Sequence, residues 1–524
     1  GWCVWGALSI GWGWLLTARV RISVKLLQIL LLLLLVIEVF SSRFYLAYWV
    51  GKNLGNEHIS IVTYAVERAV HGVPEVHLYG FYPQFLAPFF RISGLTLGNF
   101  CLLMAVLYLA VMLILMDAAR RWIRQPIFFA GCSLLLMMLM NWHDFLQRTG
   151  EIVIEPYYSY FPLRLIFPVT GLFFLLCSSR NLRNAAAAGG IAALGLWFTP
   201  DTGLALAGAG TVFYLGGILR RDSRKRALLE TAVYGGTALL MLPGTALLLR
   251  LISGAWPPVW EYCSYFRDFQ KIGYFMQPME EVFGFRMAAA MIYLGAMIAG
   301  IAALRKNGES RRGRMLLFWA VLGCGLFLYY VGRSHPFNLL TCSWPAVLLY
   351  FGFAARLWRG VRRKKLSKFW AIGVIPAILL PAGTLGVIAV RHDRIRGGLE
   401  ETAIFLREEV VITEMCREIR EYASPEGKAH LITYAQGALH LESGVQPAIP
   451  GFNLPELIFE RDYLRVKEAM LSSGAPLVMV GKHWFSERLK REIRGRYRMI
   501  RNSYMGFLQI YEPVEQGINP GAGR

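Results

Sequence analysis

The sequence is poor in charge, and poorest in acidic charge. Only 17% of its 524 residues are charged while 56% are hydrophobic, and 55 Lys and Arg stand against 34 Asp and Glu. A chain of this length has room for two domains, but so few charged residues do not describe two soluble ones. The surplus apolar surface needs lipid, which predicts a membrane protein.

Several familiar motifs are also missing. Of the eight cysteines, only Cys263 and Cys416 fall in polar outer segments, so neither a disulfide framework nor a zinc spacing is present. The polar C-terminal part holds no G-x-G-x-x-G, P-loop or nucleophile elbow. No short-period repeat or inverted repeat is visible, which disfavours a secondary transporter.

What the sequence does have is long apolar runs, which recur from Leu26 to Val390 and then stop. Each is near the length that a helix needs to cross the hydrocarbon core, and lipid satisfies no backbone hydrogen bonds, so each run is expected to be a helix. The eleven expected crossings are Leu26–Tyr45, Leu95–Met116, Ile127–Trp142, Phe161–Ser178, Ala185–Phe198, Gly203–Leu219, Leu228–Leu251, Met287–Leu304, Met315–Val331, Leu339–Leu357 and Phe369–Val390. The apolar, Trp-rich stretch Gly1–Leu16 is either a further, trimmed helix or an interfacial segment. We therefore expect a membrane all-α bundle of about 11 to 12 transmembrane helices over residues 1–390.

The segments between these runs alternate in charge. Arginine and lysine gather in every second connection: Arg19–Lys25, Arg120–Arg124, Arg180–Arg183, Arg220–Arg226, Arg305–Arg314 and Arg356–Lys368. By the positive-inside bias these connections are cytoplasmic, so the net charge of +21 does not indicate nucleic-acid binding. The long segments Ser41–Ser93, His143–Tyr160 and Ser253–Arg286, with everything after Val390, are then expected on the outer face.

Residues 391–524 have the composition of a soluble α/β domain. The pattern predicts helices in Glu400–Tyr422 and Asp462–Ser472 and strands at His430–Tyr434, Leu477–Val480 and Phe507–Tyr511. We interpret this extracytoplasmic domain as a packing or acceptor-recognition unit.

The first outer loop, residues 41–93, places a carboxylate at the start of a helix. Glu57 and His58 precede an amphipathic stretch, Ile59–Val70, that suits a helix lying flat at the membrane interface. A carboxylate held there could deprotonate an incoming hydroxyl, or it could merely complement the helix dipole.

The other outer segments hold further polar candidates. Asp144, Glu151 and Glu155 precede two tyrosines, Tyr157 and Tyr158, which are either interface anchors or sugar platforms. Arg164 lies inside an apolar run, where a charge needs a partner or must snorkel.

Two outer turns carry charge as well. In the first, Arg333, Ser334 and His335 could hold a phosphate, or the arginine could pair with a local carboxylate. In the second, Asp201 has a structural interpretation as the N-cap of the next helix.

The first outer loop resembles that of GT-C glycosyltransferases. The resemblance is carried by Asn56-Glu57-His58, the helix, His71-Gly-Val-Pro74 and Tyr82-Pro83-Gln84-Phe85. These polytopic enzymes use polyprenyl-phosphate-linked sugars, and their first outer loop carries an essential Asp or Glu, which matches Glu57. Asn56 departs from the Asp of many relatives, which puts metal binding by this loop in doubt.

The resemblance implies an inverting hexosyl- or pentosyltransferase in a bacterial inner membrane, with Glu57 as general base. Its donor would be a polyprenyl-phosphate sugar and its acceptor a glycan, lipid or protein, with the donor phosphate on Arg333, His335 and Arg164. The implied substrate-binding residues are His58, Tyr82, Asp144, Glu151, Glu155, Tyr157, Tyr158 and Asp201. No metal is required, although a divalent cation at the second-loop carboxylates stays open. The alternatives are a flippase or transporter of a lipid-linked saccharide, or a polysaccharide polymerase or ligase.

Overall fold

The protein is described from a computed structural model. It describes residues 24–40, 44, 57–72, 77, 79–141, 158, 161–219, 221–271, 284–307, 310–332, 338–339, 342–364, 366–381, 413–433, 435–449, 460–481 and 484–514.

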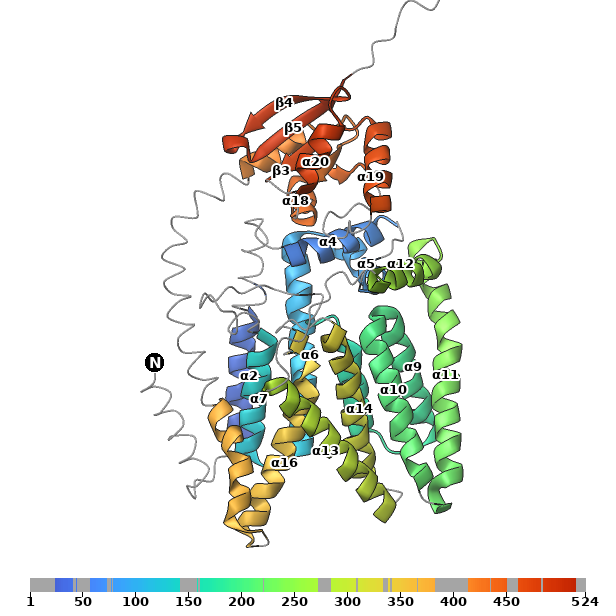
Figure 1. The fold of residues 1–524 in the computed structure, drawn as a ribbon, viewed down its shortest axis with the longest axis vertical. Helices are drawn as coiled ribbons and strands as arrows, with labels where there is room; N and C mark the ends of the chain where they lie inside the picture. The colour runs from blue at the N-terminus through green and yellow to red at the C-terminus, as the bar shows by residue number, and fades with distance from the viewer. Residues whose placement is uncertain are drawn as a thin grey trace, which may run out of the picture.

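A bundle of apolar helices forms the larger part of the molecule (Figure 1). Its members are α2 (Val24–Glu38), α6 (Leu97–Ile123), α7 (Pro126–Asn141), α8 (Ile166–Cys177), α9 (Leu182–Phe198), α10 (Pro200–Leu215) with η3 (Gly216–Leu219), α11 (Arg221–Ser253), α13 (Phe285–Lys306), α14 (Arg311–Gly332), α16 (Trp344–Arg362) and η4 (Lys368–Val374). Among the described residues, five helical segments are long and apolar enough to cross a membrane: Leu97–Ile123, Pro200–Leu219, Ser223–Ser253, Phe285–Lys306 and Arg311–Val331. They support a multi-pass membrane protein. The other expected crossings coincide with shorter helices, so the count of 11 to 12 stays a prediction.

Small residues let neighbouring helices approach closely. A Cβ on Gly203 of α10 would lie 2.4 Å from the backbone of Gly195 in α9, and a Cβ on Gly189 of α9 would lie 2.2 Å from the carbonyl oxygen of Tyr234 in α11. Such backbone contact is how helices associate where lipid offers no hydrophobic drive. It also fixes the α9–α10 turn, which carries a candidate site residue, Asp201.

Three short helices lie at one end of the bundle, between it and the C-terminal domain (Figure 1). They are α4 (Glu57–Val70) and α5 (Tyr82–Ser93) from the first outer loop, and α12 (Val259–Lys271) from the third. The helix predicted over Ile59–Val70 is confirmed.

The C-terminal domain is a five-stranded sheet with helices packed on it, in the order β2-β1-β3-β5-β4. Its strands are β1 (Lys428–Ile432), β2 (Gln446–Pro447), β3 (Leu477–Val480), β4 (Tyr497–Ser503) and β5 (Leu508–Pro513), and its helices are residues 413–421, α18 (Gln436–Ser443), α19 (Glu460–Ser473) and α20 (Trp484–Glu492), with the short turn η6 (Tyr504–Gly506). β1 pairs in parallel with β2 and β3, whereas β5 is antiparallel to β3 and β4. The three predicted strands are confirmed within about two residues at each end, while β2 and β4 were not predicted.

This domain docks on α4. The backbone N–H of Gly437 in α18 donates to Ser60 Oγ at 2.7 Å, and the rings of Tyr64 and His440 stack 5.9 Å apart. Residues 59–64 of α4 are all buried. The expectation that α4 lies flat at the membrane interface stays a prediction. Its polar face is covered by α18, because Ser60 and Tyr64 contact that helix.

Candidate functional site

Glu57 and His58 are the first two residues of α4. The N-terminus of α4 is the positive end of its helix dipole. Ile59 belongs to the same buried apolar cluster as Tyr79, Tyr82 and Tyr158, which fixes the first turn of α4 against the outer end of the bundle.

Arg164 lies in the turn that precedes α8, not inside a membrane helix. The predicted crossing began at Phe161, but the helix begins at Ile166, so the predicted start of this crossing is five residues too early. The side chain is 8% exposed. Its guanidinium carbon lies 4.7 Å from the ring centroid of Tyr79 and 4.3 Å from that of Tyr329. These two rings stabilise the cation from two sides.

Asp201 supplies the countercharge. Its Oδ2 lies 3.3 Å from Arg164 Nε, an ion pair that lacks the alignment of a hydrogen bond. The N-cap of α10 is Thr199, so the prediction that Asp201 caps this helix is wrong; it stands in the first turn, where the dipole also favours an acid. Asp201 therefore holds Arg164 by charge, without an aligned hydrogen bond to break.

The first outer loop is fastened to the turn that carries Asp201. Phe81 N–H donates to the carbonyl oxygen of Trp197 at 3.1 Å. Gly80 has a φ of +109°, and a Cβ there would lie 2.5 Å from Pro200 Cδ and 2.7 Å from the carbonyl oxygen of Phe198. Only glycine fits this contact.

His77 is a buried, neutral member of the site. Burial, and then the charge of Arg164, lower its pKa to about 3. Its Nδ1 accepts from the Tyr79 N–H at 3.2 Å, which leaves the proton on Nε2, 3.3 Å from Tyr82 Oη. His77 thus joins Tyr79, which contacts Arg164, to the start of α5.

The two described tyrosines among the predicted substrate residues lie in the core. Tyr82 and Tyr158 are both fully buried; the ring of Tyr158 packs edge-on against Phe100, with centroids 5.5 Å apart. The hydroxyl of Tyr82 also contacts His77, as described above.

The remaining candidates lie outside the described residues: Asp144, Glu151, Glu155, Tyr157, Arg333 and His335. In the part of the chain that the structure describes, no three His, Cys, Asp or Glu side chains come together to hold a metal ion.

A cavity of about 20 Å³ lies beside the Arg164–Asp201 pair, and Thr202 and Tyr329 also line it. That volume is enough for about one water molecule, so a sugar phosphate would require the surrounding loops to move. Tyr262 of α12 packs 5.4 Å from the ring of Phe81, and burial raises the pKa of its hydroxyl.

Sequence reasoning missed Tyr79, Tyr329 and Tyr262. Tyr79 and Tyr262 lie in outer loops and Tyr329 lies near the end of an expected crossing, and these positions do not separate a contact of Arg164 from an interface anchor.

No protein-family model matches the chain, and no curated protein matches its sequence. Among solved structures it is similar to ArnT from Cupriavidus metallidurans bound to undecaprenyl phosphate, with a TM-score of 0.48 and 13% identity, covering 93% of this chain and 98% of that one. The apo state of that protein gives 0.45 and 12%, with coverages of 93% and 97%. The archaeal oligosaccharyltransferase AglB from Archaeoglobus fulgidus, in complex with an inhibitory peptide and a dolichol-phosphate, gives 0.45 and 11%, with coverages of 94% and 75%. Because all three TM-scores lie below 0.5, the proposals below rest on the residues of this chain.

Proposed function

We propose that this protein is an inverting glycosyltransferase of the GT-C type. It moves a sugar from a polyprenyl-phosphate carrier to a glycan, lipid or protein acceptor at the membrane face where the C-terminal domain lies. By the positive-inside bias, that face is extracytoplasmic.

One observation carries the proposal: a buried arginine with its own carboxylate partner lies at the outer end of the bundle, under the loop whose helix starts at Glu57. Guanidinium groups suit phosphate oxygens, and a phosphate competes for Arg164 with an ion pair that has no aligned hydrogen bond. The flanking tyrosine rings keep the cation in place while its partner changes.

The proposed chemistry needs a general base, and it needs cationic groups that stabilise the leaving phosphate. Glu57 takes the proton from the acceptor hydroxyl, whose oxygen bonds to the anomeric carbon from the side opposite the carrier. The carbon–oxygen bond to the carrier breaks, and its electron pair stays on the phosphate. Arg164, together with Arg333 and His335, offsets that charge.

The test is sugar transfer by the full-length protein reconstituted in liposomes. Radiolabelled polyprenyl-phosphate sugars are offered to the wild type, Glu57→Gln, Arg164→Gln and Arg333→Ala. We expect the rate of sugar release to fall by about 100-fold or more in Glu57→Gln, with smaller losses in the arginine variants. Glu468→Gln is the matched control, because Glu468 is an exposed carboxylate of α19 in the C-terminal domain.

Equal release rates in all five proteins would contradict the proposal. Transfer of intact lipid-linked saccharide between leaflets, without bond cleavage, would identify a flippase instead.

A further inference from the structure

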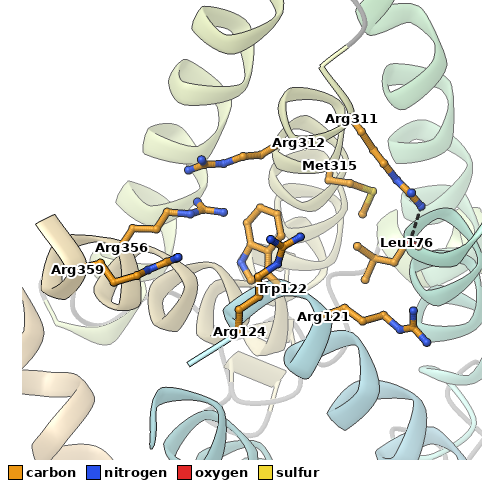
Figure 2. A pocket seen from close by; sticks show the side chains of 9 residues that line it. All are labelled: Arg121, Trp122, Arg124, Leu176, Arg311, Arg312, Met315, Arg356 and Arg359. Carbon is orange, nitrogen blue, oxygen red and sulfur yellow. Dashed lines mark hydrogen bonds between the residues drawn. The ribbon is translucent and has the colours of Figure 1, made fainter. Parts of the chain in front are cut away.

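A second cavity lies at the end of the bundle away from the C-terminal domain. Its volume is about 650 Å³, and six arginines line it: Arg121, Arg124, Arg311, Arg312, Arg356 and Arg359 (Figure 2). Arg312 and Tyr329 belong to the same helix, α14, seventeen residues apart, so roughly 26 Å of helix separates this cavity from the outer site.

Two of these arginines are already engaged. Arg121 forms an ion pair with Asp117 at 2.6 Å. The Nη2 of Arg311 donates to the carbonyl oxygens of Leu175 at 3.1 Å and Ser178 at 3.0 Å. Their guanidinium groups point away from the other four (Figure 2).

The remaining four are Arg124, Arg312, Arg356 and Arg359. Within the described ranges, none of them forms an ion pair with a carboxylate. Other arginines at the same end of the bundle do have a carboxylate partner within the protein. Arg180 and Arg226 both form ion pairs with the buried Glu230.

Three of the four converge on one another. The guanidinium groups of Arg312, Arg356 and Arg359 point into the same space (Figure 2). Arg356 interacts electrostatically with Arg312, Arg359 and Arg124, all of the same sign. Its guanidinium lies 4.6 Å from the ring centroid of Trp122, and its Nη1 is buried without a hydrogen-bond partner. Guanidinium groups that share one space repel one another unless an anion lies between them.

The backbone at two of these arginines also favours a bound anion. Arg124 caps α6 with a φ of +60°, a conformation that costs an arginine free energy and a glycine almost none. Arg312 stands in the first turn of α14, where the helix dipole disfavours a cation and attracts an anion. The arginine side chains and the N-terminus of α14 therefore both favour an anionic ligand.

We infer that this cavity binds the headgroup of an anionic phospholipid, and that its chemistry suits one with two phosphates joined by glycerol. A lipid is favoured over a soluble anion because the cavity lies among the ends of apolar helices and Trp122, Leu176 and Met315 share its lining. Basic pockets between membrane helices on the arginine-rich side recognise such headgroups.

The test is binding of diphosphatidylglycerol to the purified full-length protein, measured by native mass spectrometry as a dissociation constant. Phosphatidylcholine and inorganic diphosphate are offered in separate arms. For Arg312→Gln/Arg356→Gln we expect diphosphatidylglycerol to bind about thirtyfold more weakly than to the wild type.

Two further variants keep the outcome interpretable. Arg124→Gly removes a charge and suits the positive φ, so it should fold and still bind the lipid several-fold more weakly. Arg224→Gln removes an exposed arginine elsewhere on the same face and should bind like the wild type.

Equal lipid affinity in the wild type and the pocket variants overturns the inference. Inorganic diphosphate binding as tightly as the lipid overturns the assignment to a headgroup. Neither result depends on sugar transfer at the outer end.

Discussion

The two ends of the bundle treat arginine differently. At the outer end, Arg164 has a carboxylate partner, two tyrosine rings and about 20 Å³ of free space. At the inner end, four arginines surround about 650 Å³ with no carboxylate of the described chain paired to them. At the outer site the protein supplies the countercharge, so an anionic ligand must displace Asp201 from Arg164. At the inner cavity the ligand itself must supply the negative charge. The outer site suits a transient phosphate and the inner one a resident anion.

The largest expected effect concerns Glu67, a buried carboxyl group of α4. Burial raises its pKa to about 8, against which the nearby Arg68 acts only weakly. The unfolded chain loses this proton near pH 4.5, so stability is fully present below that pH and is lost as the pH rises toward 8, by up to about 1.4 kcal/mol per pH unit. Glu67→Gln should therefore unfold at a higher temperature than the wild type at pH 7.5 and at a similar one at pH 4.5. If the unfolding temperatures of the wild type and Glu67→Gln changed with pH in parallel, Glu67 would be ionised in the folded protein. The outer end would then carry one more negative charge than described above.

The second prediction separates the outer site from its scaffold. Gly80→Ala adds a Cβ that meets the backbone at 2.7 Å in a left-handed conformation, and should destabilise the protein by about 3 kcal/mol. Gly94→Ala is the matched control, because Gly94 also has a positive φ but no atom within 4 Å of a Cβ. It should cost about 1 kcal/mol. Similar losses in denaturant titrations would mean that the close contact at Gly80 does not hold the loop.

The third prediction removes the outer countercharge. Asp201→Ala leaves Arg164 buried without its carboxylate, and we expect a loss of about 2 kcal/mol, reduced from a fully buried pair because Asp201 is about a quarter exposed. Thermal unfolding measures the loss. Glu487→Ala, which removes the exposed partner of Lys490, should change little. An Asp201 variant as stable as the wild type would show that Arg164 does not depend on this carboxylate.

The smallest effect has the opposite sign. In lipid-free detergent, Arg356→Gln relieves repulsion from Arg312 and Arg359 and should stabilise the protein by about 1 kcal/mol. Adding diphosphatidylglycerol should stabilise the wild type more than this variant in the same thermal assay. A destabilised variant in detergent would place a countercharge within the protein and remove the contrast between the two ends.

Much of the architecture could be predicted from periodicity and composition. Leu477–Val480 was placed at its observed bounds because it is apolar and short, whereas β4, Tyr497–Ser503, was missed because most of its residues are exposed and polar. The first outer helix was found from its flanking Gly and Pro. Its burial was not, because only tertiary structure brings α18 onto it.

The sites were less accessible to sequence reasoning. Arg164 was recognised because a charge near an apolar run is costly, but Tyr79 and Tyr329 come from distant segments that the fold brings together. The inner cavity could not be foreseen either. Its arginines belong to three separate connections, and each of them satisfies the positive-inside bias without any need for a pocket.

The contact between Gly437 and Ser60 has a mechanical consequence. A Cβ on Gly437 would lie 2.5 Å from the Ser60 carbonyl oxygen, so α18 and α4 touch backbone to backbone. The close backbone approach and the hydrogen bond from Gly437 N–H to Ser60 Oγ leave little room for one helix to shift without the other. A displacement of the sheet domain is therefore expected to shift α4, the helix that begins with Glu57.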